Sequence, residues 1–174
     1  MILKILLMLL VLIAAILIFA ATKPDTFHIE RSVTIKATRE KVFPLINDLH
    51  NWPHWAPQDR EDPTMKRTFA GADSGVGAES TWIGSRNTGK GSMTITKSIP
   101  PQSITVAVDW QRPFSVRNIN QFQLEPEGAN TRVTWSMSGP NLFMMKLMSV
   151  FRNMDKMMGQ HFEDGLHNLK NIAE

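Results

Sequence analysis

Among the residues that could do chemistry, one carboxylate stands out by its surroundings. Asp155 falls near the centre of an apolar arc in a segment with helical spacing. We expect such a carboxylate to face a cavity, where it could act as a general acid or base, or hold a polar group of a ligand. The arc that we expect to line the cavity with it consists of Met148, Phe151, Met158 and Phe162.

A structural role would also explain this carboxylate. A buried carboxylate without a partner is costly, so Asp155 could pair with Arg112 or Arg117, or accept hydrogen bonds from backbone amides. The sequence leaves both roles open.

Two amides are candidates for binding a polar group. Asn118 and Asn120 lie in a run of alternating residues, on the same side as Val116 and Phe122. Both side chains are therefore predicted to point inward. They could hydrogen-bond a ligand, since apolar pockets contain a few polar groups, or they could bridge neighbouring strands.

Three indole rings could form a pocket wall. Trp82, Trp110 and Trp135 occupy inward positions of predicted strands. Such rings are commonly plain core, but ligand sites use the same residue types, so we include them among the candidate ligand-binding residues.

Other kinds of chemistry find no support. The chain has no cysteine, which excludes disulfides, thiolate metal sites and a cysteine nucleophile. The five histidines show no HExxH-like spacing, and His161, at the border of the apolar arc, precedes Asp164 by a commonplace three residues. Nucleotide-binding and GxSxG motifs are also missing. We therefore predict neither a metal nor a cofactor.

The elements that would position these residues can be predicted from periodicity. Residues 27–36 alternate as in a strand, residues 39–49 carry a helical stripe, and residues 66–137 form short alternating runs separated by turn residues. After Pro140, helical spacing returns and continues to Leu169. This order predicts an α+β fold in which one long amphipathic helix lays its apolar face on an antiparallel sheet.

The amino terminus predicts a membrane anchor. Lys4 is the only charged residue within 2–21, and a helix of this length would span roughly 30 Å, the thickness of a bilayer core. A cleaved signal peptide is the alternative, but its apolar region is usually shorter. Lys4 before the helix favours a cytoplasmic amino terminus, which would place a soluble domain outside the plasma (inner) membrane. The predicted division is 1–22 anchor, 23–26 linker and 27–174 domain.

Charge argues against nucleic acid as a partner. The formal net charge is +3, and no cluster of Lys and Arg forms a basic stripe.

An ordered series of short motifs runs through residues 27–174. Each is weak alone, but their order and spacing are more specific. The series consists of SVTIKA at 32–37, VF at 42–43, NDL at 47–49, WP at 52–53, GVG at 75–77, LEP at 124–126 and TRVTW at 131–135.

These motifs make the chain resemble the START-like helix-grip superfamily, in particular its polyketide cyclase/dehydrase-like branch. The resemblance implies a curved antiparallel sheet of about seven strands around the carboxy-terminal helix. It also implies a cavity for lipids or other apolar compounds, but it implies no reaction.

Three functions follow as hypotheses. The first is a membrane-anchored module that binds an apolar small molecule or lipid in an internal cavity. The second is a cyclase or dehydratase that uses Asp155 as acid or base, with Asn118 or Asn120 orienting a carbonyl. The third is a domain that binds another envelope protein and has a packed interior; a cavity of roughly 300 Å³ or more would argue against it.

Overall fold

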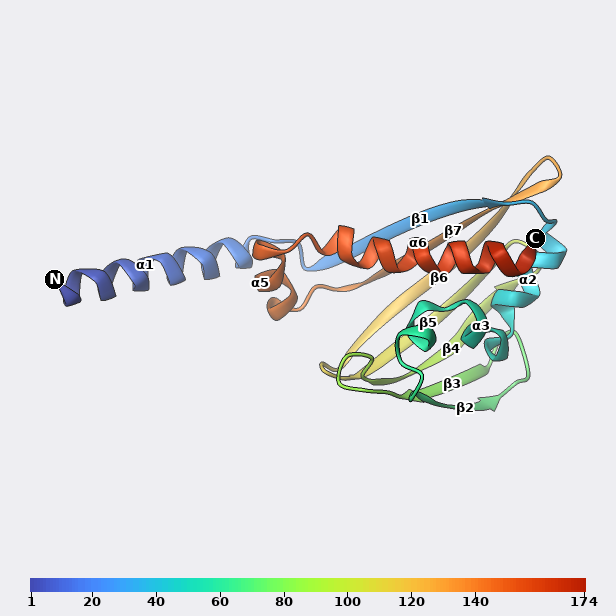
Figure 1. Cartoon of the computed structure of the whole chain (residues 1–174), viewed down its shortest axis with the longest axis horizontal. Helices are drawn as coiled ribbons and strands as arrows, with labels where there is room; N and C mark the ends of the chain where they lie inside the picture. The colour runs from blue at the N-terminus through green and yellow to red at the C-terminus, as the bar shows by residue number, and fades with distance from the viewer.

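The computed structural model describes all of residues 1–174. Seven antiparallel strands form one curved sheet in the order β1-β7-β6-β5-β4-β3-β2, and the long helix α6 lies along its concave side (Figure 1). This confirms the predicted fold class. The elements are α1 (Ile2–Ala21), β1 (Thr26–Ile35), α2 (Arg39–Asn47), a 3-10 helix (Leu49–Asn51), α3 (Trp52–Trp55), α4 (Pro57–Glu61), β2 (Lys66–Gly71), β3 (Ala78–Ile83), β4 (Lys90–Ile99), β5 (Ser103–Arg112), β6 (Val116–Glu127), β7 (Asn130–Pro140), α5 (Phe143–Phe151) and α6 (Met154–Ala173).

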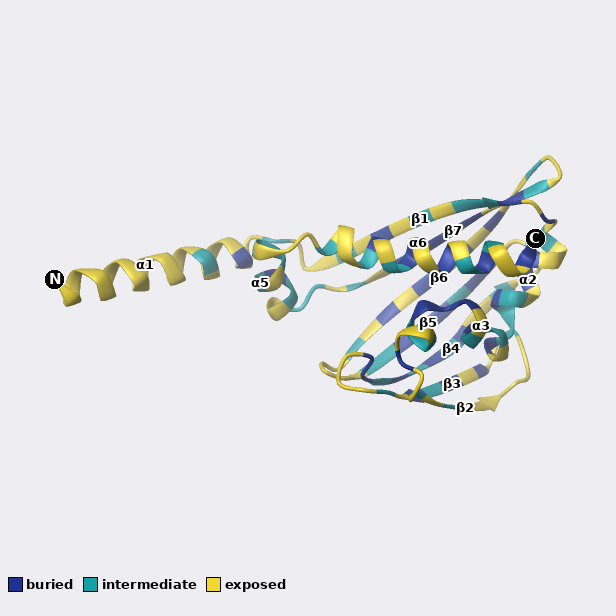
Figure 2. Ribbon diagram, in the orientation of Figure 1, coloured by how far each residue is buried: buried dark blue, intermediate teal, exposed yellow.

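The strands bury every second residue, as their sequences predict. In β6, four alternate residues from Asn118 to Leu124 are buried, while their neighbours are exposed. Figure 2 shows the same alternation along the other central strands. Because successive side chains point to opposite faces, one face of the sheet meets the helices and the other meets water.

Aromatic rings connect the sheet to the helices. Trp135 of β7 stacks on Phe162 of α6, with ring centroids 4.3 Å apart and planes at 3°. Phe122 and Trp55 complete this cluster, and both are fully buried. The short helices α2 to α4 thus close one end of the layer between the sheet and α6.

The prediction of a single helix after Pro140 is wrong in one respect, because two helices occupy this segment. Arg152 has an extended conformation (φ −134°, ψ 140°), and α6 begins after it. The side-chain oxygen of Asn153 accepts a hydrogen bond from the amide of Lys156 at 2.9 Å, which caps the new helix. An apolar arc drawn across the break therefore joins residues that do not share a face.

Helix α1 projects away from the rest of the chain (Figure 1). It is long and apolar enough to span a membrane, and nearly all of its side chains are exposed.

Candidate functional site

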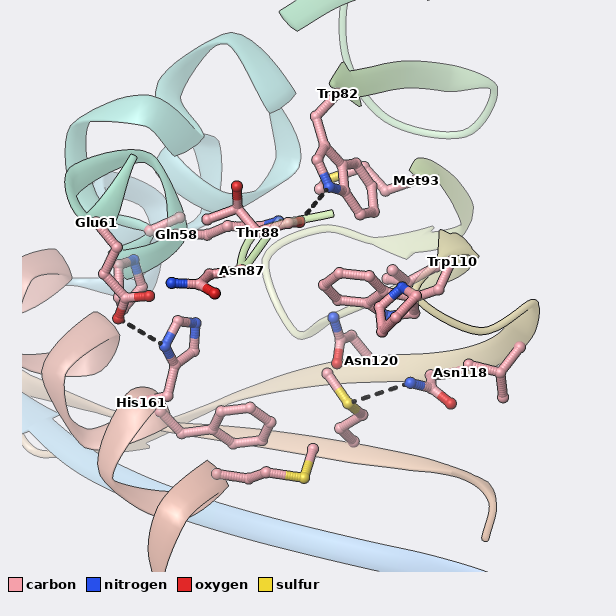
Figure 3. A pocket seen from close by; sticks show the side chains of 18 of the residues that line it. Gln58, Glu61, Trp82, Asn87, Thr88, Met93, Trp110, Asn118, Asn120 and His161 are labelled. Atoms are coloured by element: carbon pink, nitrogen blue, oxygen red, sulfur yellow. Dashed lines mark hydrogen bonds and ion pairs between the residues drawn. The ribbon is translucent and has the colours of Figure 1, made fainter. Parts of the chain in front are cut away.

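A cavity of about 430 Å³ lies between the concave face of the sheet and the helices α3, α4 and α6 (Figure 3). Of its 25 lining residues, 15 are hydrophobic. This volume and lining are typical of small-molecule sites, which use an apolar wall with a few polar groups. The third hypothesis requires a packed interior, and this cavity argues against it.

The inner wall contains the three predicted indole rings. Trp82, Trp110 and Trp135 all line the cavity. Trp82 and Trp110 meet edge to face at 5.1 Å, and the Trp82 Nε1–H donates to the backbone oxygen of Thr88 at 3.2 Å. Met93 of β4, Val108 of β5 and Met137 of β7 also line the cavity.

The two predicted amides also line the cavity, and they are incompletely satisfied. Asn118 and Asn120 are 6% and 4% exposed, and neither Oδ1 atom accepts a hydrogen bond. Asn118 Nδ2 donates only to the sulfur of Met137, at 3.7 Å. The Nε1–H of Trp135 is likewise buried without a partner. Three polar atoms of residues that line the cavity are thus buried without a protein partner.

The helix side of the cavity comes from one face of α6. Met158 and Phe162 line it as predicted, together with Met157 and His161. Leu142 and Met145 extend this wall from the start of α5. Several lining residues, among them Met157 and Phe114, are exposed, so the cavity reaches the surface here.

A polar rim lies where α4 meets α6. Nδ1 of His161 and Oε1 of Glu61 are 3.3 Å apart, and the His161 side chain is half-buried. Gln58 and Asn87 lie at the same rim (Figure 3). The sequence signal for His161 was its position at the border of the apolar arc. Its partner Glu61 comes from another helix, so no local pattern predicts the pair.

Comparison with known proteins places this fold in a family. The family model for polyketide cyclase / dehydrase and lipid transport proteins matches residues 26–174. The chain belongs to this family. No curated protein matches the chain.

Solved structures share the helix-grip fold of this family member. A protein from Chromobacterium violaceum is 14% identical with a TM-score of 0.60, over 87% of this chain and 99% of that chain. The major latex-like protein 151 of Panax ginseng is 14% identical with a TM-score of 0.60, over 86% and 99%. The Aha1 dimer of Colwellia psychrerythraea is 19% identical with a TM-score of 0.56, over 85% and 96%. At these identities the similarity shows the fold alone.

In this member of the polyketide cyclase/dehydrase family, Asp155 does not face the cavity, so that expectation is corrected. Its side chain is 63% exposed and pairs with Arg31 of β1, at 3.0 Å between Oδ2 and Nη2. Arg31 also pairs with Glu163 at 2.8 Å. The first turn of α6 lies over the edge strand β1. The carboxylate of Asp155 therefore meets Arg31, and not Arg112 or Arg117 as predicted.

Met148 and Phe151 are also misplaced by the prediction, because neither lines the cavity. Both lie in α5, on the other side of the helix break, and are 39% and 69% exposed. The break changes which side chains share a face with α6. Whether the remaining candidates bind a ligand stays a prediction.

A buried carboxylate organises the loop that forms part of the rim. Asp62 accepts hydrogen bonds from the hydroxyls of Thr64 and Thr88 and from the Ser85 backbone amide, which is 2.6 Å away. These donors hold the pKa of Asp62 far below its ordinary value. Asp62 therefore stays ionised and fixes the loop that carries Asn87.

A buried ion pair between Arg67 and Asp59 holds α4, the helix that carries part of this rim. Arg67 of β2 binds Asp59 of α4 through two contacts, Nε to Oδ1 at 2.5 Å and Nη2 to Oδ2 at 2.6 Å. The side chains are 6% and 12% exposed. This bidentate pair attaches α4 to the far edge of the sheet. Nowhere in residues 1–174 do three or more His, Asp or Glu side chains come together as a metal site.

Proposed function

We propose that this chain binds an apolar small molecule or lipid with one polar group in the cavity, and that α1 holds it at a membrane. The observation that carries this proposal is the combination of an apolar cavity of about 430 Å³ with three buried polar atoms, all on lining residues, that lack a protein partner. A buried polar group without a hydrogen bond is costly, and a ligand would remove that cost.

The unpaired atoms indicate what the polar group of the ligand should be. Asn118 and Asn120 each offer an acceptor oxygen, and Trp135 offers a donor N–H. A hydroxyl group both donates and accepts, so it could satisfy an amide oxygen and the indole together. An apolar molecule with a hydroxyl group therefore fits this wall better than a pure hydrocarbon.

The membrane part of the proposal rests on α1. Its length matches a bilayer core, and its side chains are almost all exposed, as those of a lipid-facing helix would be. Lys4 and the terminal amine precede the apolar stretch, which favours a cytoplasmic amino terminus and a domain on the extracytoplasmic side of the plasma membrane.

Binding can be tested with two tryptophan variants on the same strand. Val116 lines the cavity, whereas Ile119, three residues on, faces outward and is 38% exposed. We expect delipidated full-length protein in detergent to take up a dansyl-labelled fatty alcohol, seen by energy transfer from the cavity tryptophans. Val116→Trp should fill the cavity and abolish uptake, while Ile119→Trp should leave it unchanged. Equal uptake by both variants, or none by the wild type, would contradict the proposal.

A second candidate function, an acid-base reaction on the bound molecule, is favoured by the pair of His161 and Glu61 at the rim. The imidazole lies in the cavity wall, and the carboxylate is placed to orient it. If the reaction is a dehydration, in which the imidazole takes a proton from the bound molecule and a hydroxyl group leaves as water, native mass spectrometry should show wild-type protein converting a ligand isolated from the His161→Asn variant into a product lighter by one water. His161→Asn should bind the same ligand without changing it, and conversion by that variant would exclude the role of His161.

A further inference from the structure

Helix α5 lies beside the last turns of α1. Along α1 only Ala20 is buried and Ile16 is half-buried, and these two residues share a face because they are four apart. α5 is the element that contacts α1, and Figure 1 shows it at the junction of α1 with the rest of the chain. The covered face of α1 is thus the face that meets α5.

Polar contacts fix this arrangement at the exit from α1. Lys146 of α5 is buried and its Nζ lies 2.5 Å from Oδ1 of Asp25. The hydrogen bond from Lys146 lowers the pKa of Asp25. Asn141, just before α5, donates through Nδ2 to the oxygen of Pro24 at 3.0 Å and through its amide to the oxygen of Asp25 at 2.7 Å. The segment that follows α1, Pro24 and Asp25, is therefore held both by Asn141, just before α5, and by Lys146 within α5.

The outer surface of α5 is unusually apolar for a helix in water. The helix has no acidic residue, and its single charge, on Lys146, is buried against Asp25. A surface helix of a soluble domain normally turns charged side chains outward. The side chains that α5 exposes are instead Phe143 (49%), Met144 (47%), Met148 (39%) and Phe151 (69%).

We propose that α5 lies in the interfacial layer of the bilayer and that the cavity exchanges its ligand directly with the lipid. This inference rests on the membrane anchor of the proposed function. If α1 crosses the bilayer core, its last turns, including Ile16 and Ala20, end at the far boundary of that core, and α5 packs against those turns. An amphipathic helix at such a boundary buries its apolar face about 5–10 Å into the lipid.

The inner side of the same helix leads to the cavity. Met145 of α5 and Leu142, which immediately precedes α5, line the cavity, and the exposed Met157 and Phe114 lie at its opening. One short helix therefore presents apolar side chains both to the surface and to the cavity. A ligand that leaves the bilayer beside α5 would reach the cavity without crossing water.

The charges around α5 favour a lipid surface as the partner. Lys23 and Arg152 line a shallow groove at the end of α5, together with Phe151. The acidic residue in this groove, Asp155, is already paired with Arg31. Lys23 lies over the ring of Phe19, 4.4 Å from its centroid, and neither Lys23 nor Arg152 has a carboxylate partner. Cations of this kind next to exposed aromatic and methionine side chains suit anionic phospholipid headgroups above an acyl layer.

Spin labels can test this placement, because the chain has no cysteine of its own. Full-length protein would be reconstituted in vesicles of phosphatidylcholine and phosphatidylglycerol, with a single cysteine at Phe151, at Leu9 of α1 or at Val76. Val76 is 59% exposed in the hairpin between β2 and β3. We expect collision with oxygen, which concentrates in lipid, at Leu9 and Phe151, and collision with a water-soluble nickel complex at Val76.

The outcomes separate the two proposals. Lipid accessibility at Leu9 with a water-exposed Phe151 label would overturn the docking of α5 and leave the anchor intact. A water-exposed Leu9 label would overturn both. A Phe151 label shielded from both reagents at high protein density would indicate a second protein copy as the partner, which also overturns the inference.

Ligand exchange gives a second measurement. Phe151→Asp should slow transfer of the dansyl-labelled fatty alcohol from vesicles roughly tenfold, which corresponds to about 1.4 kcal/mol, without changing uptake in detergent. Val76→Asp is the matched control and should change neither. Unchanged transfer by Phe151→Asp would contradict exchange through the bilayer. If the wild type shows no uptake in detergent, ligand binding itself is contradicted.

Discussion

The guanidinium of Arg31 lies against Gly159, so closely that a methyl group at position 159 would be 1.9 Å from Arg31 Nη2. Asp155, Gly159 and Glu163 follow one another four residues apart and therefore form one stripe on α6. The two carboxylates bind Arg31 on either side of the glycine. This stripe seats α6 on the edge strand β1 and explains why Asp155 faces away from the cavity.

Replacing Gly159 with alanine should change stability little. The methyl group would displace the end of the flexible Arg31 side chain and break ion pairs that, being exposed, contribute about 0–1 kcal/mol. Alanine stabilises a helix by about 1 kcal/mol relative to glycine, which offsets this loss. We expect the free energy of unfolding in urea to change by less than about 1 kcal/mol.

Gly165→Ala is the matched comparison on the same helix. There the methyl group would lie 2.8 Å from Cζ3 of Trp135 and 3.1 Å from Cδ of Pro57, and neither ring can move aside easily. Overpacking of this kind costs about 1–3 kcal/mol, which equals or exceeds the gain of about 1 kcal/mol in helix propensity. Gly165→Ala should therefore lower the free energy of unfolding relative to Gly159→Ala. Equal effects of the two variants would refute this account of the two contacts.

Asn120→Leu should stabilise the protein while weakening ligand binding. The amide oxygen of Asn120 is buried without a partner, and removing an unsatisfied group of this kind recovers about 1 kcal/mol. Chemical denaturation and uptake of the dansyl-labelled fatty alcohol measure the two effects.

Thr131→Val serves as the control for Asn120→Leu. Thr131 is also buried, but its hydroxyl donates to the oxygen of Ala37 at 2.7 Å. Its loss leaves that oxygen unpaired and should destabilise the protein by about 1–3 kcal/mol without affecting uptake. A destabilised Asn120→Leu variant would mean that the amide has a structural role.

Asp59→Ala should strongly destabilise the protein. It would leave Arg67, which is 6% exposed, buried without its partner, a change that typically costs about 3–5 kcal/mol. The double variant Asp59→Leu with Arg67→Met removes both charges and should recover most of the loss. Thermal unfolding of the three proteins provides the measurement, and a mild effect of Asp59→Ala would contradict the buried pair.

Stability should fall in acid partly through Asp62. Its pKa in the folded state lies below the ordinary value of 3.8, so its stabilising contribution is present above that value and is lost as the pH falls toward the lower folded-state pKa. The wild type should therefore lose thermal stability below about pH 4, and Asp62→Asn should lose less over the same range. Parallel pH profiles of the two proteins would show that Asp62 does not contribute.

The sequence alone determined the parts of this protein that depend on local periodicity. Alternation in β6 placed Val116, Asn118 and Asn120 on the inner face, because successive strand residues must point to opposite sides. An apolar composition interrupted only by Lys4 marked residues 2–21 as a helix of membrane-spanning length.

Only the tertiary structure decided which distant side chains meet. The partner of Asp155 is Arg31, which is 124 residues away, and the contact exists because antiparallel pairing of β1 with β7 places β1 at the sheet edge under the start of α6. The pair of His161 and Glu61 likewise joins two helices. The break after Phe151 is marked in the sequence only by Asn153, which caps α6. This signal is weaker than the continuous apolar spacing around it. Periodicity fixes the face on which a residue lies, whereas sheet order and helix placement fix what that face touches.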